Sequence, residues 1–156
     1  MKDILICGPG RNGSTSMFVL LANCKNTHVT HFCPVTKETK TKNGHEQKSY
    51  KYRISIGPGN IDKIKKGEKA KGVFLSRPKK DIINSLKKFG DKVQGWDIEE
   101  YVEEYFEKAE KLEGQNFRKF DISLLNSRVG QKKIFDYLEI EEEDRRYMKD
   151  CHYNKS

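Results

Sequence analysis

The chain has 156 residues, which suffices for one compact domain with its own hydrophobic core but not for two ordinary domains. Hydrophobic and charged residues each account for 35% of the composition and the net charge is +8, which excludes a fibrous protein. No apolar run approaches the roughly 18 residues of a membrane-spanning helix, and an apolar strand begins right after Met1-Lys2-Asp3, so we expect a cytoplasmic protein without a signal peptide.

Strand and helix patterns alternate from the start of the chain. Residues 2–7 form a short apolar run that ends at a glycine, which is typical of a buried parallel strand. After a glycine-rich loop, apolar residues recur at helical spacing over residues 17–24. Residues 28–32 and 50–56 have the pattern of strands, and residues 37–49 between them predict an exposed, mobile loop.

The second half of the chain continues the alternation. Its predicted elements are a turn at 57–60, a buried strand at 71–76, a helix from about residue 79, an amphipathic helix at 98–112, a strand at 116–120 and a final helix capped by Ser127. Alternating strands and helices predict an α/β fold, with residues 1–156 forming a single small domain around a mostly parallel sheet flanked by helices. Ligands of such folds bind beyond the carboxyl ends of the strands.

The positive charge is unevenly distributed. Residues 37–80 hold fourteen lysines and arginines against four acidic residues, whereas residues 97–113 hold two against eight. A basic surface favours polyanionic partners such as nucleotide phosphates, acidic glycans, nucleic acid or an anionic membrane surface, although lysines also serve solubility alone. The four cysteines contain no CxxC pair, so we expect no disulfide framework.

The loop over residues 8–16 is built to hold an anion. Gly8 and Gly13 have the spacing of a Walker A loop, but Ser14 stands where that loop has its lysine, and Arg11 supplies the cation instead. Glycines let successive N–H groups turn inward, and a helix N-terminus adds partial positive charge. The alternative is a glycine turn with a serine or threonine helix cap.

Two stretches resemble the sulfotransferase family, whose fold is similar to that of P-loop NTPases. Residues 11–15 resemble the family's 5′-phosphosulfate loop, and Asn12 replaces the usual serine after the cation. Arg77 follows a strand and Ser85 lies eight residues later in a helix, as in the family's 3′-phosphate site. The resemblance covers nearly the whole chain, which is far shorter than most members of the family.

The resemblance implies transfer of a sulfuryl group from 3′-phosphoadenosine 5′-phosphosulfate (PAPS) to a hydroxyl or amine, without a metal. The acceptor would be a small molecule or a glycan, and the product 3′-phosphoadenosine 5′-phosphate (PAP). Arg11 would stabilise developing negative charge, and His31 or Glu38 would be the catalytic base, although a structural role for His31 stays open. The implied donor-binding residues are Arg11, Asn12, Gly13, Ser14, Thr15, Ser16, Arg77 and Ser85.

Three other interpretations stay open. A P-loop nucleotide kinase or NTPase fits the glycine spacing but would need a lysine at Ser14 and an acidic Mg²⁺ ligand at a strand end. A basic zinc-binding or nucleic-acid-binding module would use Cys24, His28, His31 and Cys33, whose spacing matches no familiar zinc pattern, so nucleic acid is not the expected partner. The third is a non-catalytic protein that retains the nucleotide site.

Overall fold

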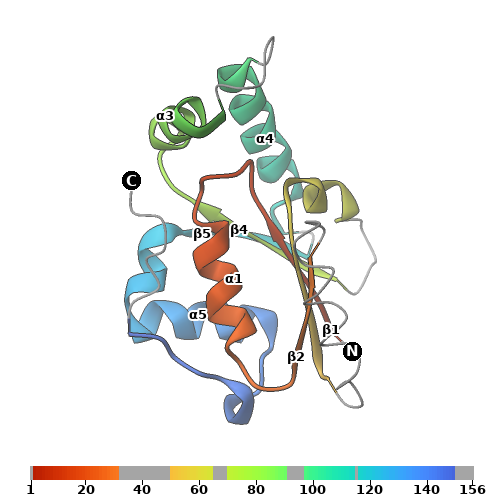
Figure 1. The fold of residues 1–156 in the computed structure, drawn as a ribbon. Coiled ribbons are helices and arrows are strands. Elements are labelled where there is room, and N and C mark those ends of the chain that lie inside the picture. Colours follow the sequence, from red (N-terminus) through yellow and green to blue (C-terminus); the bar gives the residue numbers. More distant parts are fainter. Residues whose placement is uncertain (1, 32–49, 65–69, 91–96, 115, 150–156) are drawn as a thin grey trace.

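The computed structural model describes residues 2–31, 50–64, 70–90, 97–114 and 116–149. In this part of the chain five parallel strands form one sheet in the order β2-β3-β1-β4-β5 (Figure 1). The predicted α/β fold with a parallel sheet flanked by helices is therefore confirmed. The strands are β1 (Lys2–Cys7), β2 (Thr27–His31), β3 (Tyr52–Ile56), β4 (Lys71–Ser76) and β5 (Phe117–Asp121).

Helices cover both faces of this sheet. The α-helices of the described residues are α1 (Ser14–Ala22), α3 (Lys79–Gly90), α4 (Ile98–Leu112) and α5 (Arg128–Leu138), and the 3₁₀-helices are η2 (Pro58–Lys63), η3 (Ile122–Asn126) and η4 (Glu142–Asp144). α1 and α5 pack on one face, while α3, α4 and η2 pack on the other (Figure 1). None of the helices in the described ranges is long and apolar enough to cross a membrane.

The central strands are buried on both sides, which explains their continuous apolar runs. Successive side chains of a strand point to opposite faces of its sheet. In β4, Val73 and Leu75 join the core under α1 and α5, whereas Phe74 joins the core under α3 and α4. In β1, Ile6 and Cys7 divide between the two cores in the same way. The parallel sheet therefore needs helices on both faces.

The predicted boundaries hold with small differences. β3 begins at Tyr52 instead of the predicted Tyr50. Tyr50 precedes the strand, and its ring packs against the His28 ring at a centroid distance of 5.4 Å. The predicted turn at 57–60 continues as the 3₁₀-helix η2. The Ser127 hydroxyl accepts a hydrogen bond from the Gly130 amide at 2.9 Å and caps α5 as predicted. The predicted loop at 37–49 lies outside the described residues.

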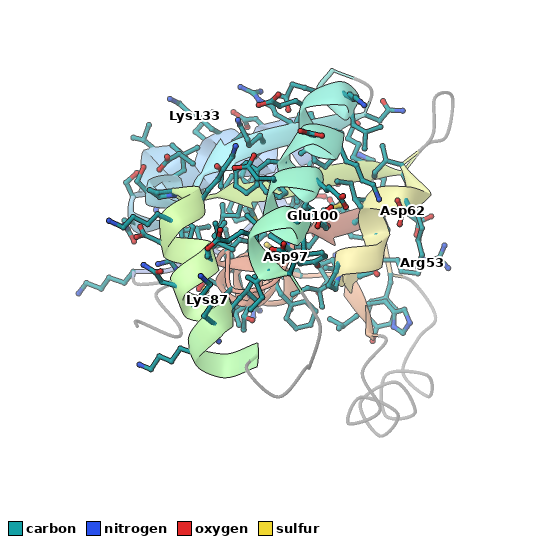
Figure 2. All side chains as sticks on the ribbon, turned by 90° about the horizontal axis from the view of Figure 1, so that it is seen from above. Arg53, Asp62, Lys87, Asp97, Glu100 and Lys133 are labelled. Atoms are coloured by element: carbon teal, nitrogen blue, oxygen red, sulfur yellow. The ribbon has the colours of Figure 1, made fainter. Side chains whose placement is uncertain are left out.

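α3 and α4 lie side by side over one face of the sheet (Figure 2). The Asp97 carboxylate caps α4 by accepting a hydrogen bond from the Glu100 amide at 3.0 Å. Lys87 of α3 pairs with Glu99 of α4 at 2.7 Å. Both partners of this pair are exposed, so the contact contributes little to stability. The acidic residues of the stretch at 97–113 lie on the solvent-facing side of α4, opposite its buried apolar face.

The C-terminal segment is anchored to the amino ends of β2 and β3 through one buried carboxylate. Asp144 is 1% exposed, and its two oxygens accept hydrogen bonds from Asn26 at 2.7 Å, Tyr52 at 2.9 Å and Lys51 at 3.1 Å. Burial acts to raise the pKa of Asp144, but these three donors outweigh it and lower the pKa below its usual value. The ionised carboxylate therefore stabilises the fold.

We predict that acid unfolds the protein partly through Asp144. A carboxylate with a lowered pKa contributes stability above its unfolded pKa, near 3.8, and that stability is lost as the pH falls through the lower folded value. Asp144→Asn should lower the free energy of unfolding at pH 7 by about 1–3 kcal/mol. The variant should also lose less stability than the wild type between about pH 5 and pH 2.5.

Urea unfolding at a series of pH values measures both effects. Asp81→Asn, which changes an exposed carboxylate on α3, is the matched control and should leave the stability at pH 7 within about 0.5 kcal/mol of the wild type. An Asp144→Asn protein with the same acid dependence as the wild type would contradict the assignment.

Candidate functional site

The sheet order brings the two predicted phosphate-binding segments together. The loop at 8–13 follows β1, and residues 77–78 follow β4, which is the neighbour of β1 in the sheet. The two strands are parallel and Cys7 is in register with Phe74, so both segments leave the same carboxyl edge. α1 then crosses one face and α3 the other. Parallel sheets bind ligands at such a divergence of neighbouring connections.

The loop ends in a glycine that no other residue replaces without rearrangement. Gly13 has a φ of 97°, and a Cβ there would lie 2.7 Å from the Ile122 side chain and 2.8 Å from that of Leu75. Gly13 is also the N-cap of α1, and no side chain caps this end of the helix. The serine or threonine cap of the alternative interpretation is therefore wrong, because Ser14 already lies inside the helix. The glycine turn of that interpretation is present.

Asn12 has a structural role in the site. Its side chain is fully buried, and its Nδ2 donates to the Leu75 carbonyl at 2.7 Å and to the Cys7 carbonyl at 3.5 Å. Its Oδ1 accepts a hydrogen bond from the Ser14 hydroxyl at 2.6 Å. The amide thus joins the carboxyl ends of β1 and β4.

The residues predicted for the 3′-phosphate meet the cation of the loop. Arg11 Nε donates a hydrogen bond to Ser85 Oγ at 3.0 Å, although the two residues are 74 positions apart. Arg77 Nη1 donates to the Arg11 carbonyl at 3.2 Å. Ser85 is 5% exposed, about two turns into α3. The structure therefore brings Arg11, Arg77 and Ser85 into one cluster.

The other predicted site residues lie in the first turn of α1, at the end of β2 or outside the described residues. Thr15 is exposed and Ser16 is buried in the first turn of α1. The backbone of His31 pairs with Ile56 at the carboxyl end of β2. β3 separates β2 from β1, so this backbone lies about 10 Å from β1 across the sheet. Glu38 lies outside the described residues.

Two tyrosines of α4 contact the loop, which the sequence did not predict. Tyr105 and Tyr101 fit the apolar face of an amphipathic helix, yet their hydroxyls bond to backbone groups of Gly8 and Pro9. A buried tyrosine hydroxyl needs a hydrogen-bond partner, so tyrosines on the apolar face of a predicted helix indicate polar contacts inside the protein. Helical periodicity says nothing of where that partner lies.

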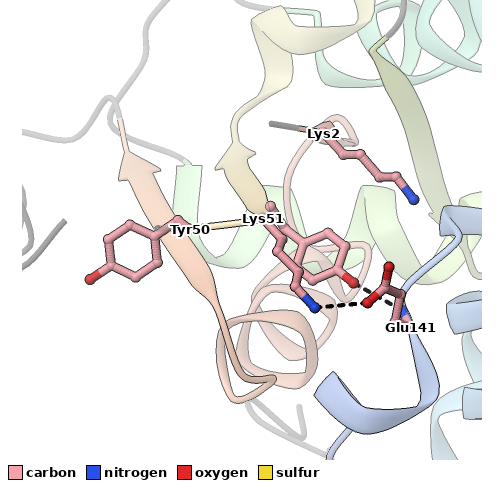
Figure 3. Close-up of a pocket in the computed structure, with 5 residues that line it drawn as sticks. Lys2, Tyr50, Lys51 and Glu141 are labelled. Carbon is pink, nitrogen blue, oxygen red and sulfur yellow. Dashed lines mark hydrogen bonds and ion pairs between the residues drawn. The ribbon is translucent and has the colours of Figure 1, made fainter. Parts of the chain in front are cut away.

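A pocket of about 420 Å³ lies at the opposite edge of the sheet. Figure 3 shows Lys2, Tyr50, Lys51 and Glu141 in its lining, together with Tyr52. The Lys51 ammonium pairs with Glu141 at 2.7 Å and also with Glu143 and Asp144, the three carboxylates that form the one candidate metal-binding group within the described ranges. Asp144 anchors the C-terminal segment, and Glu141 and Glu143 pair with the same lysine, so these carboxylates have a structural role.

The described members of the zinc alternative have other partners. Cys24 is buried, and its thiol donates to the Leu20 carbonyl at 3.6 Å. His28 packs against the Tyr50 ring. Cys7 and Cys24 are free thiols, and Cys33 and Cys151 lie outside the described residues. Among the described residues, neither Cys24 nor His28 belongs to a group of side chains that could hold a metal.

Comparisons with known proteins add no family: no family model matches the chain, and no curated protein matches it significantly. The function must therefore be argued from the loop, Arg77 and α3.

We predict that Asn12 is required for stability. Asn12→Ala removes the donor to two buried carbonyls and should lower the free energy of unfolding by about 2–3 kcal/mol. Urea unfolding measures the loss. Asn84→Ala, at an exposed position of α3, is the matched control and should change stability by less than about 0.5 kcal/mol. Equal stability of the two variants would refute the bridging role of Asn12.

Proposed function

We propose that the protein is a PAPS-dependent sulfotransferase that transfers a sulfuryl group to a hydroxyl or amine of a small molecule or glycan. The contact between Arg11 and Ser85 at 3.0 Å carries this proposal. It joins the candidate 5′-phosphosulfate loop to the candidate 3′-phosphate site, and both resemble sulfotransferase signatures. One nucleotide with anionic groups at its 5′ and 3′ positions fits two neighbouring anion sites.

The charge of the cluster suits this donor. Arg11 and Arg77 contribute two guanidinium groups, which donate hydrogen bonds to the Ser85 hydroxyl and to the Arg11 carbonyl. Hydrogen bonds from arginine to phosphate are charge-assisted and about twice as strong as neutral ones. ATP has no 3′-phosphate, so it would leave the Arg77 and Ser85 side of the site without its ligand. The cluster therefore favours a nucleotide with a 3′-phosphate over ATP.

The proposed chemistry is an in-line substitution at sulfur. The acceptor oxygen or nitrogen forms a bond to sulfur, while the bond from sulfur to the oxygen shared with the 5′-phosphate breaks. Negative charge develops on that leaving oxygen, and Arg11 together with the N–H groups at the start of α1 would stabilise it. The acceptor proton passes to a base, for which His31 and Glu38 are the candidates.

A nucleotide kinase or NTPase is the nearest rival, since a P-loop-like strand, loop and helix serve both chemistries. A kinase or NTPase would have its Walker A lysine at the position of Ser14, whose hydroxyl donates a hydrogen bond to Asn12. Asp121, at the end of β5, accepts a hydrogen bond from the Ser123 amide at 2.9 Å, which gives it a capping role. Neither residue supports the rival.

Binding and transfer together test the proposal. The wild-type protein should bind PAP more tightly than ATP with Mg²⁺, and it should transfer label from ³⁵S-PAPS to at least one member of a panel of sugars, phenols, lipids and tyrosyl peptides. Tight binding of ATP with Mg²⁺ and none of PAP would rule the sulfotransferase out. Binding of PAP without transfer to any acceptor would favour the non-catalytic nucleotide-binding protein.

We predict that Arg77 selects the 3′-phosphate. Arg77→Ala should weaken PAP binding by about 10–100-fold, since a hydrogen bond to a charged group contributes about 1.5–3 kcal/mol. It should leave binding of adenosine 5′-phosphate, which lacks the 3′ group, nearly unchanged. Isothermal titration calorimetry measures both affinities. Arg53→Ala, which removes an arginine paired with Asp3, is the control and should alter neither.

A further inference from the structure

The first half of the loop is held by two tyrosines one turn apart on α4. Tyr105 accepts a hydrogen bond from the Gly8 amide at 2.8 Å, and Tyr101 donates to the Pro9 carbonyl at 3.1 Å. Residues four apart on a helix lie one above the other on the same face, so this pair reaches two consecutive residues of the loop. The tyrosine rings meet edge to face at a centroid distance of 6.1 Å.

Tyr105 also links the loop to the end of a second strand. Its hydroxyl donates to the Pro58 carbonyl at 2.8 Å, in the segment that follows β3. The ring is 5% exposed and stacks on Phe74 at 5.8 Å. Burial raises the pKa of Tyr105, so the hydroxyl stays protonated and can donate and accept at once. The Tyr105 hydroxyl thus links Gly8 to the segment after β3, while its ring packs on β4.

These contacts decide which backbone groups of the loop can meet an anion. The Gly8 N–H is used by Tyr105, which leaves anion binding to amides further along the loop. A carbonyl oxygen carries partial negative charge and would repel a phosphate. Tyr101 holds the Pro9 carbonyl toward α4. The pair therefore sets the path of the chain into Gly10 and Arg11, whose φ values are 102° and 57°.

Packing alone does not account for the two hydroxyls. The apolar face of α4 also contains Phe106, whose ring packs edge to face on Phe74 at 5.3 Å without a polar group. Phenylalanine at positions 101 and 105 would bury the same rings. Both hydroxyls are instead bonded to the segment between β1 and Arg11.

We propose that Tyr101 and Tyr105 are positioning residues that preset the loop for the 5′-phosphosulfate end of the donor. This inference rests on the proposed function. The tyrosines do not touch the donor, and they act through the backbone of Gly8 and Pro9. Removing either hydroxyl should therefore weaken recognition of the 5′ group and leave recognition of the 3′-phosphate by Arg77 and Ser85 intact.

Calorimetry with two nucleotides tests this division. Tyr105→Phe should weaken binding of PAP about tenfold, and its affinity for adenosine 3′-phosphate, which lacks the 5′ group, should stay within about twofold of the wild type. Tyr101→Phe should act in the same direction. Tyr101 is only partly buried, so this variant remains folded if Tyr105→Phe does not. Tyr137→Phe is the matched control, because its buried hydroxyl has no partner among the described residues.

The outcomes separate this inference from the proposed function. Wild-type affinity for PAP in both tyrosine variants would overturn the positioning role and leave the sulfotransferase proposal standing. An equal loss of affinity for both nucleotides would also overturn it, because it would reveal a general structural role. A wild-type protein that binds neither nucleotide would refute the proposed function itself, and the inference with it.

Discussion

The buried amide of Asn12 is the interaction on which the site depends. β1 and β4 are adjacent in the sheet, but their pairing ends at Cys7 and Phe74 and their connections leave to opposite faces, so the strand ladder does not extend to the segments that follow. Asn12 does so by donating to a carbonyl at the end of each strand. A buried amide needs such partners, and breaking them leaves unpaired carbonyls in the core. Gly13 then fits between Leu75 and Ile122 because the loop is held this close.

The loop is therefore supported from two sides. Asn12 ties its second half to β4, and the tyrosines of α4 tie its first half to the far face of the sheet. Arg11 lies between these supports, in a left-handed conformation with a φ of 57° that is costly for a residue with a side chain. Such strain persists where the surroundings impose it, and it is common in ligand-binding loops.

Much of the fold could be predicted because the apolar residues of its strands and helices follow regular sequence patterns. Continuous apolar runs predicted β1 and β4, and the apolar spacing between Ile98 and Leu112 predicted α4 with the right boundaries. These patterns do not predict the spatial order of the strands, because no local sequence feature places β3 between β1 and β2. Spacing alone predicted that Arg77 and Ser85 lie close together, and both contact Arg11 in the structure, while their role in binding a 3′-phosphate stays a prediction. The role of Asn12 was not predictable, because its partners are backbone carbonyls of strands that periodicity does not place side by side.

The hydrogen bonds that anchor Asp144 to the amino ends of β2 and β3 affect the order in which the chain folds. Tyr52 and Asp144 are 92 positions apart, so their contact closes a large loop and forms late compared with local helices. During synthesis the N-terminal strands leave the ribosome long before residue 144 does. Until then the amino ends of β2 and β3 lack this cover, and β2 is the outermost strand on its side of the sheet among the described residues. The edge of a sheet is the kind of surface that pairs with other chains. Asp144 thus completes the cover of strands that are synthesised well before it.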